Sequence, residues 1–194
     1  MLNKSAIRNA MRELRKKTWE SYMLDPNGYY NLIERYTLPA ILPFIENESQ
    51  IVSGFYPVNQ EFDCVYLLRL LKQQFNQRIA LPVVVGKNEP LIFREWDGLD
   101  DSLIPGTFKV PVPNESFEEV EPDVVLSPMI AFNSDMIRLG YGSGYYDRTL
   151  ALLRKKKQIV TIGVGYKSQF SDQIPIEEHD EALDAIVTEE GRFL

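Results

Sequence analysis

A glycine-rich segment in the C-terminal half carries the residue types best suited to chemistry. It reads Arg138-Leu-Gly-Tyr-Gly-Ser-Gly-Tyr-Tyr-Asp-Arg148. Glycine lets the backbone turn tightly and approach a ligand closely, and successive amides in such a turn converge on phosphate oxygens. Arg138 and Arg148 add cations for a phosphate, and Asp147 adds a carboxylate that suits a metal ion. The segment therefore predicts a phosphate site, although its glycines alone fit a purely structural turn equally well. It is neither a Walker loop nor the dinucleotide fingerprint, because its glycine spacing differs from both.

A second group of charges lies near the N-terminus, where the pattern predicts a helix over 3–20 capped by Asn3. At helical spacing, four cations fall within an arc of roughly 80°. They are Lys4, Arg8, Arg12 and Arg15. Such a stripe could clamp a triphosphate, although a solvated face is the alternative. The core side of the same helix is predicted at Ala6, Ile7, Ala10, Met11 and Leu14.

An acidic segment over 177–181 contains the only histidine of the chain, His179. Acidic loops are usually solvated surface. Hard carboxylate oxygens also suit Mg²⁺, so Asp180 could join Asp147 in holding this ion. His179 has no second histidine or cysteine nearby in the sequence, so we expect an exposed or capping role for it rather than a zinc site.

Whole-chain composition excludes several other classes of function. The net charge of −7 disfavours nucleic-acid binding through bulk electrostatics. Cys64 is the only cysteine, which excludes an intrachain disulfide and a cysteine-rich zinc site, and its apolar neighbours predict a buried thiol. The sequence shows no signal peptide and no apolar run of the roughly 20 residues that span a bilayer. We therefore expect a cytoplasmic protein with small-molecule partners, no nucleic acid and no membrane.

The elements that must position these groups follow an α/β pattern. Helices are predicted over 3–20, 28–45 (with prolines at 39 and 43), 60–76 and 145–156, and strands over 50–56, 78–85, 123–126, 129–132, 159–164 and 185–188. The stretch 86–121 is rich in proline and predicts loops, short strands or a hairpin. Alternating strands and helices are typical of a mainly parallel sheet flanked by helices. In this pattern, the glycine segment joins a strand to a helix.

Taken together, these motifs resemble the 5-formyltetrahydrofolate cyclo-ligase family, also called methenyltetrahydrofolate synthetase. The matching segments are 126–132 (Leu-Ser-Pro-Met-Ile-Ala-Phe), 138–148, His179-Asp180 with 184–188, and Lys4-x-x-x-Arg8 on the first helix. The resemblance implies one three-layer α/β domain over 1–194. It also implies conversion of 5-formyltetrahydrofolate to 5,10-methenyltetrahydrofolate, with ATP as co-substrate, Mg²⁺ as cofactor, and release of ADP and phosphate.

The resemblance also implies the site residues. ATP would contact Lys4, Arg8, Arg138, Leu139, Gly140, Tyr141, Gly142, Ser143, Gly144, Tyr145 and Tyr146. The folate would contact Tyr56, Glu61, Tyr141, Gly142, Ser143, Gly144 and Tyr145. Catalytic roles would fall to Arg138, Tyr146 and Arg148, and Mg²⁺ to Asp147 and Asp180. We expect a monomer.

Three positions depart from the family pattern. Asn133 and Met136 stand where the family commonly has aspartate and glycine, and Ser143 stands where many members have glycine or lysine. The loss of a carboxylate at 133 puts its local hydrogen-bonding role in question, and Met136 predicts a differently shaped entry to the glycine segment. They also leave open a non-catalytic folate or nucleotide binder on the same fold. A further alternative is an enzyme of sugar phosphates or coenzyme A in which the glycine turn is only structural.

Overall fold

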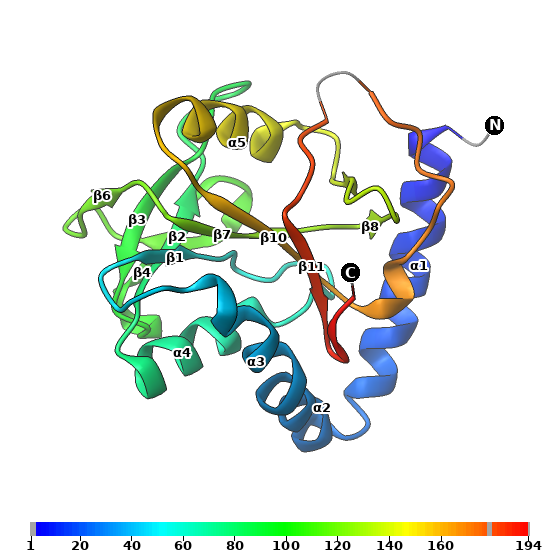
Figure 1. Cartoon of the computed structure of the whole chain (residues 1–194), viewed down its shortest axis with the longest axis horizontal. Helices are drawn as coiled ribbons and strands as arrows, with labels where there is room; N and C mark the ends of the chain where they lie inside the picture. Colours follow the sequence, from blue (N-terminus) through cyan, green and yellow to red (C-terminus); the bar gives the residue numbers. More distant parts are fainter. Residues whose placement is uncertain (1–2, 178–179, 194) are drawn as a thin grey trace.

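The central element is a twisted, mainly parallel sheet. Within residues 3–177 and 180–193, which the computed structural model describes, this sheet has eight strands (Figure 1). In order across the sheet they are β12 (Gly191–Arg192), β11 (Ala185–Thr188), β10 (Val160–Val164), β7 (Val124–Pro128), β1 (Ile51–Ser53), β2 (Arg78–Val83), β3 (Ile92–Trp96) and β6 (Glu119–Val120). The strands from β11 to β2 pair in parallel, whereas β12, β3 and β6 pair antiparallel at the two edges. The predicted fold class is confirmed.

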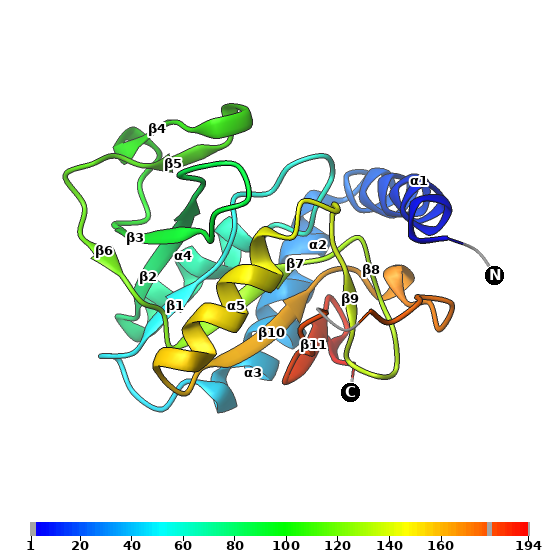
Figure 2. The same ribbon diagram turned by 90° about the horizontal axis from the view of Figure 1, so that it is seen from above.

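Helices cover both faces of the sheet. The described helices are α1 (Lys4–Tyr22), α2 (Pro26–Leu32), α3 (Leu38–Ile41), α4 (Cys64–Phe75) and α5 (Tyr145–Lys156), with a π-helical turn (Ile33–Thr37) between α2 and α3. Figure 1 shows α5 on one face and α2, α3 and α4 on the other. Figure 2, seen from above, shows α1 beside the end of the sheet. None of the helices among these residues is both long enough and apolar enough to cross a membrane.

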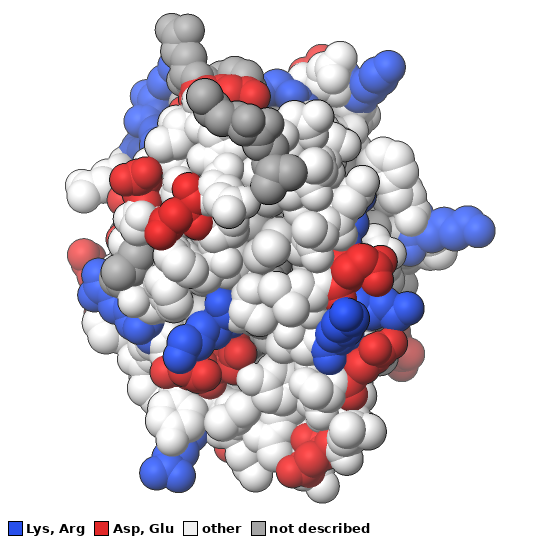
Figure 3. Space-filling model, turned by 90° about the vertical axis from the view of Figure 1, so that its right-hand side faces the viewer, with Lys and Arg blue, Asp and Glu red and all other residues white. Residues whose placement is uncertain are grey.

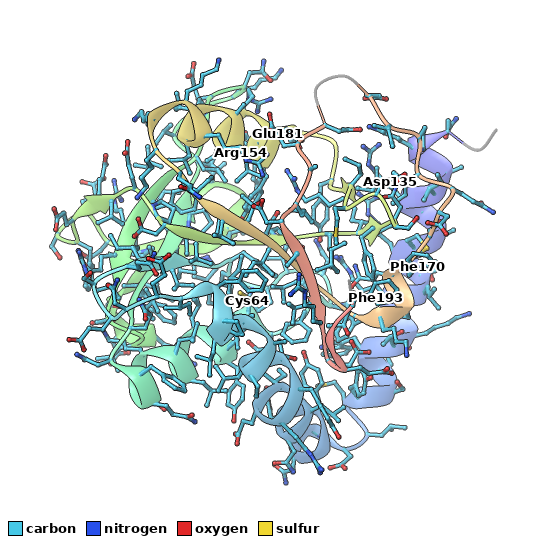
Figure 4. The ribbon with its side chains drawn as sticks, in the orientation of Figure 1. Cys64, Asp135, Arg154, Phe170, Glu181 and Phe193 are labelled. Atoms are coloured by element: carbon cyan, nitrogen blue, oxygen red, sulfur yellow. The ribbon has the colours of Figure 1, made fainter. Side chains whose placement is uncertain are left out.

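Alternating strand residues build the core on each face. On the face of α4, the buried strand residues are Val52, Ile79, Leu81, Val124, Leu126, Ile162 and Val164. On the face of α5, Ile51, Ala80 and Val125 pack with Leu150 and Leu153 of the helix. Because side chains alternate between the faces of a strand, adjacent residues such as Ile51 and Val52 serve different cores. Cys64 is fully buried in the first of these cores, as predicted (Figure 4).

The predicted core face of the first helix is only partly correct. Ile7 and Met11 are buried, but Leu14 is 40% exposed, and Ala6 and Ala10 are exposed as well. The inward stripe is spaced by four residues and continues to Arg15, which is 1% exposed. At the N-terminal half of α1 this stripe packs against a small cluster formed by the turn 130–139 and Ile174. Arg15, predicted as part of the basic stripe, is therefore in the interior.

Several element boundaries differ from the prediction for local reasons. The helix predicted over 60–76 begins at Cys64, because the Asp63 carboxylate accepts from the amide of Tyr66 at 2.9 Å and caps the helix there. The helical stretch predicted over 28–45 runs from Pro26 to Phe44, with the π turn inside it and a 3₁₀ turn (Leu42–Phe44) at its end.

The irregular middle and the segment before the glycines form two hairpins. In the middle, β4 (Leu103–Pro105) pairs with β5 (Pro111–Pro113), and 3₁₀ turns cover Asp100–Ser102 and Thr107–Lys109. The strand predicted over 129–132 is instead β8 (Ala131–Phe132), which leaves the main sheet and pairs with β9 (Arg138–Leu139). This second hairpin leads directly into the glycine segment, which joins β9 to α5 as predicted.

Candidate active site

A cavity of about 490 Å³ lies where the carboxyl ends of β1, β2 and β7 meet. This edge of a parallel sheet is the usual place for a ligand in an open α/β fold. All of the sequence-predicted site residues except Arg148 line it: Lys4, Arg8, Tyr56, Glu61, Arg138, Leu139, Gly140, Tyr141, Gly142, Ser143, Gly144, Tyr145, Tyr146, Asp147 and Asp180. The fold therefore brings together residues from the two ends and the middle of the chain.

An adjoining cavity of about 510 Å³ extends the site. It shares six lining residues with the first cavity, namely Val84, Thr107, Phe108, Gly142, Ser143 and Tyr145. The glycine segment thus forms part of the wall of both cavities, and two ligands bound side by side would both meet it.

The glycine segment adopts the tight turn that its sequence predicts. Gly142 and Gly144 have φ angles of 100° and 67°, which side chains rarely tolerate. A Cβ at Gly144 would lie 2.7 Å from an Arg148 nitrogen, and one at Gly142 would lie 3.3 Å from the Arg8 guanidinium carbon. The turn is also held from α1, since Arg8 Nε donates to the Gly140 carbonyl at 2.8 Å. It ends at the N-terminus of α5, where free amides and the helix dipole favour an anion.

Arg138 is the most deeply buried cation of the cavity wall. Its side chain is 3% exposed and donates to Asp147 at 2.7 Å and to the Glu181 carbonyl at 3.1 Å. Burial lowers the pKa of Arg138, and the nearby Asp147 and Asp180 charges oppose that shift. Its guanidinium also lies 5.8 Å from the centre of the Tyr146 ring. Arg138 is therefore held rigidly, with its charge beside the cavity.

Arg148, for which a catalytic role is expected from the resemblance, contacts the glycine turn. It does not line either cavity. Its Nη2 donates to the Ser143 carbonyl at 2.8 Å, and its guanidinium lies 5.3 Å from the centre of the Tyr145 ring. These contacts stabilise the glycine turn from its outer side.

Lys4 closes the rim of the cavity by pairing with the C-terminal segment. Its ammonium donates to both oxygens of Asp180, at 2.8 and 3.0 Å, and lies 3.1 Å from Glu177. The chain beyond Asp180 is fixed by Arg154 of α5, which pairs with Glu181 and donates to the Ala182 carbonyl at 2.7 Å (Figure 4). His179, predicted to be exposed or capping, lies outside the described residues.

The carboxylates of Asp147 and Asp180 fit the predicted magnesium site in their chemistry. Both line the first cavity, and both lie near Arg138. Among residues 3–177 and 180–193, no cluster of three or more acidic, histidine or cysteine side chains is arranged to hold a metal ion. Mg²⁺ commonly uses only one or two protein carboxylates and completes its shell with phosphate oxygens and water. Two carboxylates beside an anion site are therefore a sufficient protein contribution.

A buried polar cluster lies between α1 and the cavity. The hydroxyl of Tyr141 accepts from Arg15 Nη2 and donates to Glu61 Oε1, each at 2.8 Å. Glu61 is 6% exposed, and burial raises the pKa of its carboxyl, while the Val58 amide and Arg15 oppose this shift. The Tyr141 ring lies beneath two guanidinium groups, since Arg12 and Arg15 are 5.5 and 5.6 Å from its centre. These contacts fix Tyr141 against α1.

The two unusual residues before the glycine segment retain a regular turn. Asn133 Oδ1 accepts from the amides of Asp135 and Ile137 at 3.1 and 2.9 Å, which is the bonding that a carboxylate there would provide. Met136 has a φ of 61°, the conformation that favours glycine. Both departures from the family pattern thus leave the entry to the glycine segment intact.

Sequence reasoning missed two parts of the site. Arg15 was predicted as part of an exposed stripe, and no local signal places it inside. The β4–β5 hairpin contributes Thr107, Phe108, Val110 and Val112 to the cavity wall. Phe108 is 75% exposed and has a φ of 58°. The prolines at 105, 111 and 113 signalled a hairpin but not its place over the cavity.

The surface on the side of α1 carries both signs of charge. Figure 3 shows basic and acidic side chains intermixed across this face. The ion pairs made by α1 include Lys16 with Glu20 at the surface and Lys4 with Asp180 at the cavity rim. A mixture of both signs on this face disfavours binding of an extended polyanion there.

Comparison with known proteins gives a consistent result. The family model for the 5-formyltetrahydrofolate cyclo-ligase family matches residues 1–189. The 5-formyltetrahydrofolate cyclo-ligase of Escherichia coli K12 is 34% identical over 142 residues, which cover 71% of this chain and 76% of that protein. The enzyme of the same name from Mycolicibacterium smegmatis is 29% identical over 194 residues, covering 96% and 93% of the two chains.

A solved structure agrees with these sequence matches. The NMR structure of Aquifex aeolicus 5,10-methenyltetrahydrofolate synthetase superimposes with a TM-score of 0.73 at 27% identity, and covers 97% of this chain and 91% of that one. The match includes the α/β sheet whose carboxyl edge forms the cavity. The chain therefore belongs to the 5-formyltetrahydrofolate cyclo-ligase family and is an enzyme of folate metabolism.

Proposed function

We propose that this enzyme uses Mg²⁺ and ATP to convert 5-formyltetrahydrofolate to 5,10-methenyltetrahydrofolate, with release of ADP and phosphate. The observation that carries the proposal is the glycine turn at the start of α5, which lies beside three cavity-lining cations, Lys4, Arg8 and Arg138. Backbone amides and cations of this kind hold a polyphosphate. The matched family supplies the identity of the folate.

In this proposal the triphosphate lies along the turn from Gly140 to Gly144. Arg8 is already aligned with the turn through its bond to Gly140, and Lys4 lies at the rim. Asp147 and Asp180 would hold Mg²⁺, which when bound neutralises phosphate charge and orients the γ-phosphoryl group. The cations that now pair with these carboxylates would then be available to the phosphate oxygens.

The folate would occupy the apolar part of the cavity beside the glycine turn. Phe55, Val58, Pro82, Leu91, Val112 and Pro128 line this part. A pterin ring is flat and apolar on its faces but donates N–H groups from one edge. Glu61 lines the same cavity, and its carboxylate would accept hydrogen bonds from that edge. Tyr56 and Tyr145 would lie beside the ring.

The chemistry requires activation of a poor leaving group. The formyl oxygen would attack the γ-phosphorus of ATP, which breaks the bond to ADP and leaves an iminium phosphate. N10 would then attack the formyl carbon and lose its proton, and the phosphate group would depart with the former formyl oxygen. The protein's contribution is alignment and charge stabilisation. Arg138 provides a rigid charge for this purpose, and the Tyr146 hydroxyl, buried in the cavity wall without a hydrogen-bond partner, is placed to donate to the substrate.

One assay tests the proposal directly. The purified protein is mixed with Mg-ATP and 5-formyltetrahydrofolate, and the absorbance of the methenyl product is followed, with reactions lacking ATP or Mg²⁺ as controls. We expect absorbance to rise only in the complete mixture. Binding of nucleotide and folate without turnover would favour the non-catalytic binder. Failure of the protein to bind either compound would contradict the proposal.

A further inference from the structure

Arg15 is buried beneath the cavity in a way that packing alone does not explain. Its side chain is 1% exposed, and its Nε and Nη1 atoms have no hydrogen-bond partner. A buried guanidinium with unsatisfied N–H groups is costly and is a weak source of stability compared with an apolar side chain. The contacts that it does make all lead to one wall of the cavity.

Two of these contacts join separate loops of that wall. Nη2 of Arg15 donates to the Tyr141 hydroxyl in the glycine segment and to the Asn59 carbonyl after β1, each at 2.8 Å. Asn59 and the next residue, Gln60, have φ angles of 50° and 62°. Positive φ angles in side-chain-bearing residues persist only where the surroundings enforce them. Arg15 is one of the groups that enforce this turn.

The turn presents the carboxylate of Glu61. Its Oε1 accepts from the Tyr141 hydroxyl and its Oε2 from the Val58 amide at 2.9 Å. Each carboxylate oxygen has two lone pairs, so each retains capacity for one more donor. Arg15 Nη1 lies 3.6 Å from Oε1. It supplies the opposite charge without occupying the remaining lone pair of that oxygen.

We propose that Arg15 is a positioning residue for the folate site. Through its bonds to Tyr141 and Asn59, Arg15 holds the Glu61 carboxylate in place, so that this carboxylate can accept hydrogen bonds from two N–H groups at the edge of the ligand's ring. This inference rests on the proposed function, because it takes the folate ring as the ligand of Glu61. Arg15 lines neither cavity. It therefore acts on affinity for the folate through Glu61. Its contact with the glycine turn is with the Tyr141 side chain, whereas the proposed phosphate contacts of that turn are made by backbone amides.

The test separates the two substrates. We compare wild-type protein with Arg15→Met and Tyr141→Phe, and use Lys16→Met as the matched control, because Lys16 is an exposed cation on the same helix. Dissociation constants for 5-formyltetrahydrofolate and for Mg-ATP are measured separately by calorimetry. Arg15→Met should weaken folate binding about 10- to 100-fold, while Mg-ATP binding changes less than about twofold and Lys16→Met changes neither.

The double variant tests whether both residues act through the same carboxylate. Tyr141→Phe should weaken folate binding in the same direction, and Arg15→Met/Tyr141→Phe should be no weaker than Arg15→Met alone, since coupled groups are non-additive. Additive losses, or a folate affinity for Arg15→Met within twofold of wild type, would overturn the inference. If Arg15→Met does not fold, unchanged folate affinity in Tyr141→Phe overturns it instead.

The pH dependence of folate affinity is a further test, because a purely structural role of Arg15 would leave it unchanged. Among the described residues, the titratable groups around Glu61 include Arg15 from α1, Tyr141, Tyr146 of α5, Cys64 of α4, and Tyr166, whose hydroxyl donates to the Glu61 carbonyl at 3.3 Å. Arg15 is the cation among them, so Arg15→Met should shift the acid-side loss of folate affinity to higher pH. An unshifted profile overturns the inference. If the wild-type protein turns over the folate and the variants bind it with normal affinity, only the role of Arg15 is refuted. If the wild-type protein binds no folate, the proposed function is refuted as well.

Discussion

Lys4 and Asp180 are 176 positions apart in the sequence, yet the Lys4 ammonium donates to both oxygens of the Asp180 carboxylate. The pair joins α1 to the segment that precedes β11, at the rim of the cavity lined by the glycine turn. One residue is proposed to bind phosphate and the other to bind Mg²⁺. Binding of Mg-ATP should therefore exchange this internal ion pair for contacts with the ligand.

Replacing Lys4 by methionine should weaken ATP binding by roughly 10-fold, which is typical for loss of one charge-assisted hydrogen bond. Calorimetry with Mg-ATP measures the change. Lys16→Met is the control, because Lys16 is on the same helix but pairs only with Glu20 in the surface contact described above. Equal ATP affinity in the Lys4 variant and wild type would remove Lys4 from the phosphate site.

Alanine substitutions in the glycine turn should destabilise the protein by different amounts at different positions. Gly142→Ala and Gly144→Ala should each lower the free energy of unfolding by about 1–2 kcal/mol, because alanine is strained at positive φ. Gly140→Ala should cost less than about 0.5 kcal/mol, since an added Cβ there meets no atom within 4 Å. Urea denaturation of the three variants gives the comparison. A uniform cost at all three positions would show that φ is not the controlling factor.

Removal of the Asp147 carboxylate should raise the Mg²⁺ requirement. For Asp147→Asn we expect the Mg²⁺ concentration at half-maximal activity to increase on the order of tenfold. Asp172→Asn is the matched control, because Asp172 is exposed, bonds to Ser134 and does not line the cavity. Unchanged metal dependence in the Asp147 variant would exclude this residue as a ligand.

The structure alters what should be expected of Arg138→Ala. A purely catalytic role for Arg138 would predict lower turnover with folding intact. Because Arg138 is buried and bonds to Asp147 and the Glu181 carbonyl, its loss should also lower the free energy of unfolding by roughly 1–3 kcal/mol. Single-turnover kinetics and urea denaturation on the same preparation separate the two effects. Full stability in the variant would show that these contacts are dispensable for folding.

Glu189 should make stability depend on pH. It is 3% exposed, and burial raises the pKa of its carboxyl above the ordinary value of 4.5. The folded state therefore binds this proton more tightly than the unfolded state. The resulting stabilisation is present below about pH 4.5 and is lost as pH rises through the folded pKa.

Glutamine at 189 cannot ionise, so comparison with Glu189→Gln isolates this contribution. As pH rises from 4.5, the stability of wild type relative to the variant should fall and then level off. Unfolding free energies measured across this range provide the test. A difference that is independent of pH would contradict the raised pKa.

The sequence predicts the sheet and the glycine turn well because their signals are local. Apolar runs such as 123–126 and 159–164 coincide with β7 and β10, and the glycines at 142 and 144 coincide with positive φ. The family resemblance adds the residues that meet across the cavity, which no local pattern brings together. Their roles in binding remain predictions.

What the sequence could not show depends on tertiary contacts. Arg15 is buried because Tyr141 and Asn59 are brought to it from distant parts of the chain, and a helical wheel places it with the solvated cations. Leu14 appears apolar and inward but is exposed, because α1 packs on a narrow surface at the end of the sheet. For Arg15, the neighbours that decide its burial are 44 and 126 residues away in the sequence.

The closure of the rim by Lys4 and Asp180 has a consequence for synthesis of the protein. During translation α1 emerges 176 residues before Asp180, the partner of Lys4. A ribosome-bound intermediate that lacks β11 and the segment before it has an incomplete nucleotide site. Intracellular ATP should therefore protect the finished polypeptide against proteases while giving little protection to the growing one.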